Sequence, residues 1–190
     1  MANIDYRDKR FLVIDDQPLA RESLRAIAQT AGAFAVEFAP GYQDAIFKIR
    51  NNTPDIILCD YVLGDGRSGQ QLLEELRRFN LLPDECIFMM VTGEQSYEQV
   101  VAAVELVPDD YIIKPFSPEK LLLRLDRVAA KKKFFAAFYR EKRKQEYDRA
   151  LAVLAATRDT DAGRAYRFEA LRQEAEVHLA AGNAEKAESA

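Results

Sequence analysis

The 190-residue sequence predicts an α/β protein, in which a doubly wound parallel sheet is followed by an all-α extension. Two observations support this fold class. Short runs such as FLVI and DIIL are apolar at consecutive positions, which is typical of strands buried on both faces of a parallel sheet. Helical patterns separate these runs, and alternating strands and helices build layered α/β folds. We therefore expect a first domain over residues 5–130 and a helical extension over residues 131–190.

Five units of strand and helix follow one another in the first domain. The expected strands lie in RFLVIDD, FAVEFA, DIILCDY, ECIFMMVT and DDYIIKPF. The helices between them are expected in PLARESLRAIAQTAG, GYQDAIFKIRNN, QQLLEELRRFN and SYEQVVAAVELV. The fifth helix is expected to begin with Ser117 as its N-cap and Pro118 in its first position, because serine and proline favour these places.

After Pro118 the chain has no glycine or proline until beyond Ala156, which predicts one continuous helix over residues 118–156. Such a helix would be on the order of 60 Å long. Its apolar stripe consists of Leu121, Leu125, Val128, Phe135 and Tyr139, with Lys132 interrupting it. A partner helix, from this chain or another, must cover the stripe. A further helix is expected in RAYRFEALRQEAEVHLA.

Composition limits the classes of function. A hydrophobic fraction of 48% and a net charge of -4 are typical of a globular protein with a core. No apolar run reaches the roughly 20 residues that span a bilayer, and the charged N-terminus does not resemble a secretory signal, so we expect a cytoplasmic protein without membrane partners. Residues 118–150 are basic, but the overall acidity and the lack of a helix-turn-helix pattern predict no DNA partner.

Polar residues stand where the expected strands end. Asp15 and Asp16 follow the first strand, Asp60 ends the third, Thr92 the fourth and Lys114 the fifth. The carboxyl ends of parallel strands form the ligand-binding edge of an open α/β sheet. Three converging carboxylates repel one another unless a hard cation such as Mg2+ binds them. Together with a lysine and a hydroxyl, this set of groups suits phosphoryl transfer.

Each of these residues also has a purely structural interpretation. Asp15 could cap the helix that starts near Pro18, Asp60 could simply end a strand, and Thr92 with Gly93 could form a turn. A flavodoxin-like nucleotide binder shares the fold, but no glycine-rich phosphate loop follows the first strand. A phosphatase with a D-x-D nucleophile motif is poorly supported, because the two N-terminal aspartates are adjacent.

Together with the segment YIIKPF, these residues resemble the receiver domains of two-component response regulators, over roughly residues 8–130. The resemblance implies a five-stranded sheet of order 2-1-3-4-5. It also implies that Asp60 is the phosphorylated aspartate, that Thr92 and Tyr111 are the switch residues, and that Lys114 is the catalytic lysine. Thr92, Lys114 and Asp60 would then form the catalytic set.

The same resemblance implies a metal site. Mg2+ would be held by Asp16, Asp60 and the backbone carbonyl of Val62, with Asp15 contributing through water. The resemblance further implies a cis peptide bond between Lys114 and Pro115.

The function implied is that of a receiver that takes a phosphoryl group from a sensor histidine kinase or a phosphotransfer protein. The chain would catalyse only its own phosphorylation and dephosphorylation, and the helical extension would bind a downstream protein. A phosphate sink or phosphorelay receiver, and a scaffold that works without phosphorylation, remain alternatives.

Two fragments of the extension, EYDRALAVL and AGNAEKAESA, resemble tetratricopeptide repeats, although a helical hairpin without repeat identity stays open. Because repeats bury their apolar faces only against neighbours, we expect the native array to continue beyond Ala190. We also expect a homodimer, paired through Phe135, Phe138 and Leu151.

Overall fold

The computed structural model describes residues 4–64, 66–93, 108–158 and 160–182. The chain divides into two compact units, Met1–Ala130 and Lys131–Ala190. Among the described residues, two hydrophobic clusters lie in the first unit and one lies in the second. The helix predicted in SYEQVVAAVELV, residues 96–107, lies outside the described residues.

The first unit is built on a five-stranded parallel sheet of order β2-β1-β3-β4-β5. The strands are β1 (Arg10–Ile14), β2 (Ala35–Ala39), β3 (Ile56–Cys59), β4 (Ile87–Thr92) and β5 (Asp110–Ile113). The predicted fold class and strand order are confirmed. Since the order reverses between β1 and β3, the carboxyl ends of these two strands mark the crevice in which an open α/β sheet binds its ligand.

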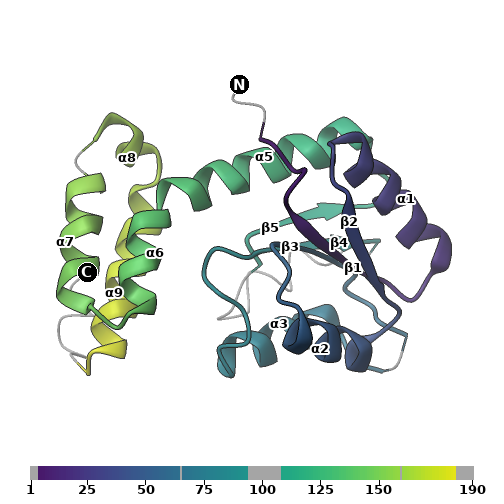
Figure 1. Cartoon of the computed structure of the whole chain (residues 1–190), viewed down its shortest axis with the longest axis horizontal. Helices are drawn as coiled ribbons and strands as arrows, with labels where there is room; N and C mark the ends of the chain where they lie inside the picture. Colours follow the sequence, from purple (N-terminus) through teal and green to yellow (C-terminus); the bar gives the residue numbers. More distant parts are fainter. Residues whose placement is uncertain (1–3, 65, 94–107, 159, 183–190) are drawn as a thin grey trace. The chain divides into compact units, whose positions relative to one another are not determined.

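Helices cover both faces of this sheet (Figure 1). They are α1 (Pro18–Thr30), α2 (Tyr42–Asn51), α3 (Gly69–Arg78) and α5 (Pro118–Phe134). Residues of α2 and α3 pack against one face, and residues of α1 and α5 against the other. Strand β1 shows why consecutive residues are apolar: Leu12 and Ile14 pack under α2 and α3, whereas Phe11 and Val13 pack under α1 and α5.

Side chains at the helix starts explain two of the boundaries. The predicted start of α5 is confirmed, because the helix begins at Pro118 and the backbone N–H of Lys120 donates to Ser117 Oγ at 3.3 Å. At the start of α3, Ser68 Oγ accepts from the Gln71 backbone N–H at 3.2 Å, and the Gln71 side chain accepts in return from the Ser68 N–H at 3.0 Å. This capping box fixes the point at which the loop after β3 becomes helix.

The continuous helix predicted over residues 118–156 is wrong. The segment instead forms α5, which ends at Phe134, then α6 (Ala136–Arg143) and the start of α7 (Tyr147–Arg158). Gln145 adopts a left-handed conformation with φ 61°, and the N–H groups of Gln145 and Glu146 donate back to the carbonyls of Lys142 and Glu141. This hydrogen-bond pattern is a Schellman motif, which ends α6 without the usual glycine.

The predicted apolar stripe is divided between two cores. Leu121, Leu125 and Val128 are buried in the first unit, whereas Phe135 and Tyr139 are buried in the second. The predicted cover comes from this chain itself, because each half of the stripe packs in the core of its own unit.

The core of the second unit also corrects the predicted dimer surface. Phe135, Phe138 and Tyr139 are almost completely buried there against Ala150 and Leu154 of α7. The described residues also form α8 (Asp161–Ala165) and α9 (Arg167–Ala180), into which the single predicted helix divides. The chain's own α7 and α9 cover Phe135 and Phe138. These two side chains are therefore not available for the predicted contact between two copies.

The second unit is helical, as predicted. Most of the fragment AGNAEKAESA, residues 183–190, lies outside the described residues, and nothing in the described part of the unit establishes repeat identity, so the tetratricopeptide resemblance stays a prediction. In the described residues, no helix combines the length and the apolar character that crossing a membrane requires.

Candidate functional site

The parallel sheet brings the predicted polar residues to one edge. Asp15 follows β1 and Asp60 follows β3, and the preceding residues Ile14 and Cys59 are register partners. Thr92 is the last residue of β4 and pairs with Ile113 of β5. Lys114 comes next in the chain. The carboxyl ends of four strands therefore place these groups together, as the strand-end pattern predicts.

Lys114 joins the two buried carboxylates of this edge. Its Nζ donates to Asp15 Oδ2 and to Asp60 Oδ2, each at 2.8 Å. Asp15 is 0% exposed and Asp60 is 8% exposed, so both negative charges are largely removed from water. One ammonium thus faces two carboxylates, and the cluster keeps an excess of negative charge.

The pKa values follow from burial and from this excess charge. Burial raises the pKa of the Asp60 carboxyl, Lys114 opposes that effect and Asp15 adds to it, so that the pKa lies above its ordinary value. For Lys114, burial alone lowers the pKa, but the hydrogen bonds to Asp15 and Asp60 outweigh it and raise the pKa above the ordinary value. The ammonium therefore stays charged at neutral pH, where it can meet a phosphoryl oxygen.

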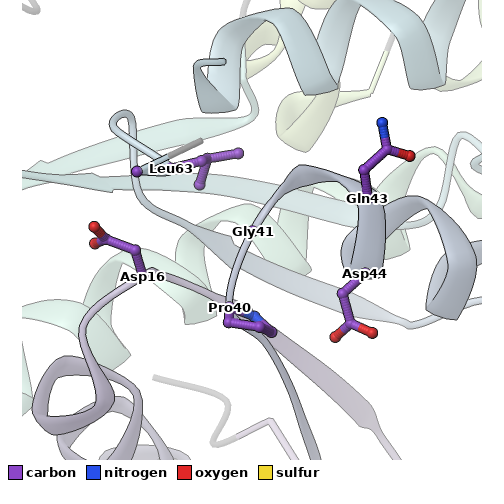
Figure 2. Close-up of a pocket in the computed structure, with 7 residues that line it drawn as sticks. Asp16, Pro40, Gly41, Gln43, Asp44 and Leu63 are labelled. Atoms are coloured by element: carbon purple, nitrogen blue, oxygen red, sulfur yellow. The ribbon is translucent and has the colours of Figure 1, made fainter. Parts of the chain in front are cut away.

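Asp16 stands apart from the pair held by Lys114. Its side chain is exposed and lies against Gly64, where an added Cβ would be 2.7 Å from Asp16 Oδ2. Gly64 has φ +71°, which favours glycine. Asp16 also borders an open hollow of about 420 Å³, whose other lining residues are Pro40, Gly41, Gln43, Asp44, Leu63 and Gly64. Figure 2 shows Asp16 on one side of this hollow, with Gln43 and Asp44 of α2 on the other.

The structure assembles the predicted metal set only in part. Within the described residues, no three acidic, histidine or cysteine side chains gather as a metal group. Lys114 Nζ lies between Asp15 and Asp60, 2.8 Å from Oδ2 of each. The Val62 N–H donates to Asp60 Oδ1 at 3.4 Å, so Val62 does lie beside the Asp60 carboxylate. The donor set nevertheless fits a hard divalent cation, because it consists of carboxylate and carbonyl oxygens with uncompensated negative charge.

The two predicted switch residues lie on neighbouring strands. Thr92 is fully buried, and its carbonyl accepts from the Lys114 backbone N–H at 2.7 Å. Tyr111 is half-buried and packs against the cluster under α2 and α3. Arg124 of α5 donates to the Tyr111 carbonyl at 2.9 Å and to Asp110 Oδ1 at 2.6 Å. The predicted cis peptide bond between Lys114 and Pro115 is confirmed.

Sequence reasoning missed Gly69, the first residue of α3. A Cβ at this position would lie 2.2 Å from the Asp60 backbone oxygen and 2.8 Å from Cys59 Sγ. Only a hydrogen fits there, so Gly69 allows α3 to approach the end of β3. A glycine directly after the N-cap Ser68 was the signal available, because glycine is a poor helix former.

A five-stranded parallel α/β domain with two aspartates and a lysine at the carboxyl edge of its sheet defines the flavodoxin-like class of receivers. The sequence model described as "Response regulator receiver domain" matches residues 11–126. The chain belongs to this family.

Curated relatives match the same region. The chain is 35% identical over 120 residues to the phosphate regulon transcriptional regulatory protein PhoB of Escherichia coli (strain K12), covering 63% of this chain and 51% of PhoB. It is 35% identical over 118 residues to the response regulator MprA of Mycobacterium sp. (strain KMS), covering 61% and 48%. The chain thus spans about half the length of these curated relatives.

A solved structure supports the same comparison. The CheY-like response regulator receiver domain protein from Methanospirillum hungatei JF-1 is 30% identical, has a TM-score of 0.58, and is matched over 66% of this chain and 96% of its own.

The comparisons give no support to the prediction that DNA is not a partner, since PhoB is named a transcriptional regulatory protein.

Proposed function

We propose that Asp60 accepts a phosphoryl group from a sensor histidine kinase or a phosphotransfer protein, and that the helical second unit passes the signal to a protein partner. The observation that carries the first part is the contact of Lys114 Nζ with Asp60 Oδ2 at 2.8 Å, at the carboxyl edge of the sheet. A cation held beside a carboxylate nucleophile serves phosphoryl transfer by position and charge.

In the proposed reaction, a carboxylate oxygen of Asp60 attacks the phosphorus as the bond from phosphorus to the donor's histidine nitrogen breaks. The nitrogen keeps the electron pair and takes a proton from solvent. Lys114 turns one of its hydrogen bonds toward the incoming phosphoryl oxygens, and Thr92 donates its hydroxyl to them. Asp15 keeps the lysine on the sheet edge, because it holds Lys114 Nζ at 2.8 Å.

Magnesium belongs to the same proposal. Asp15, Asp16, Asp60 and the Val62 carbonyl would hold the ion, which compensates the charge of carboxylates and phosphoryl group when bound. We propose that the chain catalyses only its own phosphorylation and dephosphorylation.

A small-molecule phosphodonor such as acetyl phosphate tests the acceptor. Intact-mass measurement of the full chain with Mg2+ should show one added phosphoryl group, and Asp60→Asn should abolish the addition. Asp8→Asn, an exposed carboxylate in the turn before β1, is the matched control and should label like the unchanged chain. Full labelling of Asp60→Asn would exclude Asp60 as the acceptor.

The protein-binding output rests on the surface of α9. Phe168 is 88% exposed and Leu179 is 62% exposed, and their spacing of 11 residues places them on one helix face. A hollow of about 460 Å³ in the same unit is lined by Arg158, Arg164, Arg167 and Leu171. An apolar and cationic surface favours a protein partner with apolar and acidic groups.

The same α9 face could pair two copies of the chain, so the predicted homodimer stays a proposal, on a surface other than the one first expected. Sedimentation of Phe168→Ser beside the unchanged chain distinguishes these outputs. If the unchanged chain is a dimer and this substitution dissociates it, the α9 face pairs two copies. If both samples are monomers, the result favours binding of another protein at this face.

A further inference from the structure

The loop between β3 and α3 is closed on itself by backbone contacts. Val62 and Ser68 form an isolated antiparallel bridge, and the Leu63 N–H donates to the Arg67 carbonyl at 3.3 Å. At the end of the loop, the Gly69 N–H donates to the Tyr61 carbonyl at 2.8 Å. The described part of this loop is therefore a compact turn that starts directly after Asp60.

The Arg67 side chain fastens this turn to two helices. Its guanidinium carbon lies 4.3 Å from the ring centroid of Tyr42, the first residue of α2. Its Nη1 lies 3.8 Å from Glu75 Oε2 of α3. The Tyr42 hydroxyl donates to the same Glu75 oxygen, which closes the triangle. Tyr42 is 3% exposed, so the ring is a fixed surface on which the guanidinium rests.

The turn that Arg67 fastens touches the proposed metal ligands. Gly64 lies directly against the Asp16 carboxylate, and Val62 donates its N–H to Asp60. Neither contact is made by Arg67 itself. A shift of the turn would therefore move Gly64 and Val62 relative to Asp16 and Asp60, while the buried sheet below stays in place.

We propose that Arg67 is a positioning residue, held by Tyr42 and Glu75, which sets the affinity of the sheet edge for a divalent cation. This inference rests on the proposed receiver function, because it concerns the same metal set. The new element is that the affinity for the cation depends on the contact of Arg67 with α2 and α3. This contact does not include the oxygen ligands themselves.

Calorimetric titration of the full chain with Mg2+ tests the proposal without any phosphodonor. Arg67→Gln removes the cation from the Tyr42 ring and from Glu75, and should raise the Mg2+ concentration for half-saturation about two- to fivefold, the range that the energy of an exposed cation–π contact allows. Arg67→Lys keeps the charge and should lie between Arg67→Gln and the unchanged chain. Tyr42→Leu removes the ring and should weaken Mg2+ binding in the same direction.

Arg78→Gln is the matched control. Arg78 is the last residue of α3, and its guanidinium lies 5.7 Å from the Phe79 ring centroid, so the substitution removes the same charge and the same kind of contact. This variant should bind Mg2+ like the unchanged chain. Circular dichroism of each variant shows whether it is folded at the titration temperature.

Two failures can be told apart. If the unchanged chain binds Mg2+ and is phosphorylated, but Arg67→Gln has the same half-saturation as Arg78→Gln, the positioning role is wrong and the receiver function stands. If the unchanged chain neither binds Mg2+ nor takes a phosphoryl group, both proposals are overturned.

Discussion

Replacing Lys114 with methionine should destabilise the first unit, because two buried carboxylates would lose the ammonium that they share. Breaking a buried ion pair costs about 3–5 kcal/mol. Since 28% of the Lys114 side chain is exposed, water screens part of this interaction, and we expect a loss of about 2 kcal/mol in the free energy of unfolding near pH 7. Methionine keeps most of the length of the aliphatic chain, so the lost charge dominates the change.

The loss should depend on pH through Asp60, whose pKa is raised above its ordinary value of 3.8. A carboxyl with a raised pKa binds its proton more tightly in the folded state. The stability linked to that proton is fully present below the ordinary value and is lost as the pH rises through the raised one. Lys114 lowers the pKa of Asp60, so its removal raises that pKa further. The destabilisation should therefore shrink as the pH falls from neutral toward about 4.

Urea denaturation at about pH 7 and about pH 5 measures both effects. Adding Asp60→Asn to Lys114→Met should recover part of the lost stability at neutral pH, because one of the two unpaired charges disappears. Lys9→Met is the control, since the pair of Lys9 with Asp55 at 3.3 Å is at the surface and should contribute at most about 1 kcal/mol. A Lys114→Met loss no larger than that of the control, or equal at both pH values, would refute the reasoning.

Three further substitutions test other parts of the structure. Gly69→Ala should destabilise the receiver by about 2 kcal/mol or more in urea denaturation, because its Cβ would lie 2.2 Å from the Asp60 backbone oxygen. Gln145→Gly should raise the free energy of unfolding of the second unit by about 0.5–1 kcal/mol, since φ is 61° there; no gain would contradict the assigned helix end. Phe138→Ala should lower the free energy of unfolding of the second unit by about 3–5 kcal/mol, because Phe138 is buried in its core, and phosphorylation of the receiver should be unchanged.

The sheet was predictable because burial on both faces leaves a direct mark on the sequence. All residues of β3 are apolar, and so are all residues of β1 except Arg10. Short runs of this kind between turn residues are typical of strands in a parallel sheet. The strand-end residues Asp15, Asp60 and Lys114 were predictable for a related reason, since charged groups next to buried strands need a partner. Their geometry follows from the parallel register once the order of strands is known.

The second unit was harder to predict because helix ends do not always use glycine or proline. Gln145 adopts a positive φ, and no local pattern distinguishes it from a residue within a helix. Helical periodicity also cannot tell which partner covers an apolar stripe. Leu125 and Phe135 follow one pattern in the sequence, yet they are buried in different cores.

The contact that supports the loop after Asp60 was missed because its members are far apart in sequence. Tyr42 and Arg67 belong to different elements and meet only when α2 and the turn after β3 lie side by side. Neither residue has a sequence context that indicates such a contact. The metal set was predicted from Asp15, Asp16, Asp60 and the Val62 carbonyl, and it stays a prediction; in the structure, Lys114 joins Asp15 and Asp60, and Asp16 lies outside this pair.

The position of the acyl phosphate tests the central claim most directly. After reaction with acetyl phosphate and Mg2+, borohydride reduction converts a phosphorylated aspartate into homoserine, which peptide mass spectrometry assigns to one residue. We predict homoserine at position 60 and at no other aspartate. Homoserine at Asp15 or Asp16, or no conversion in a chain that is folded and binds Mg2+, would contradict the account.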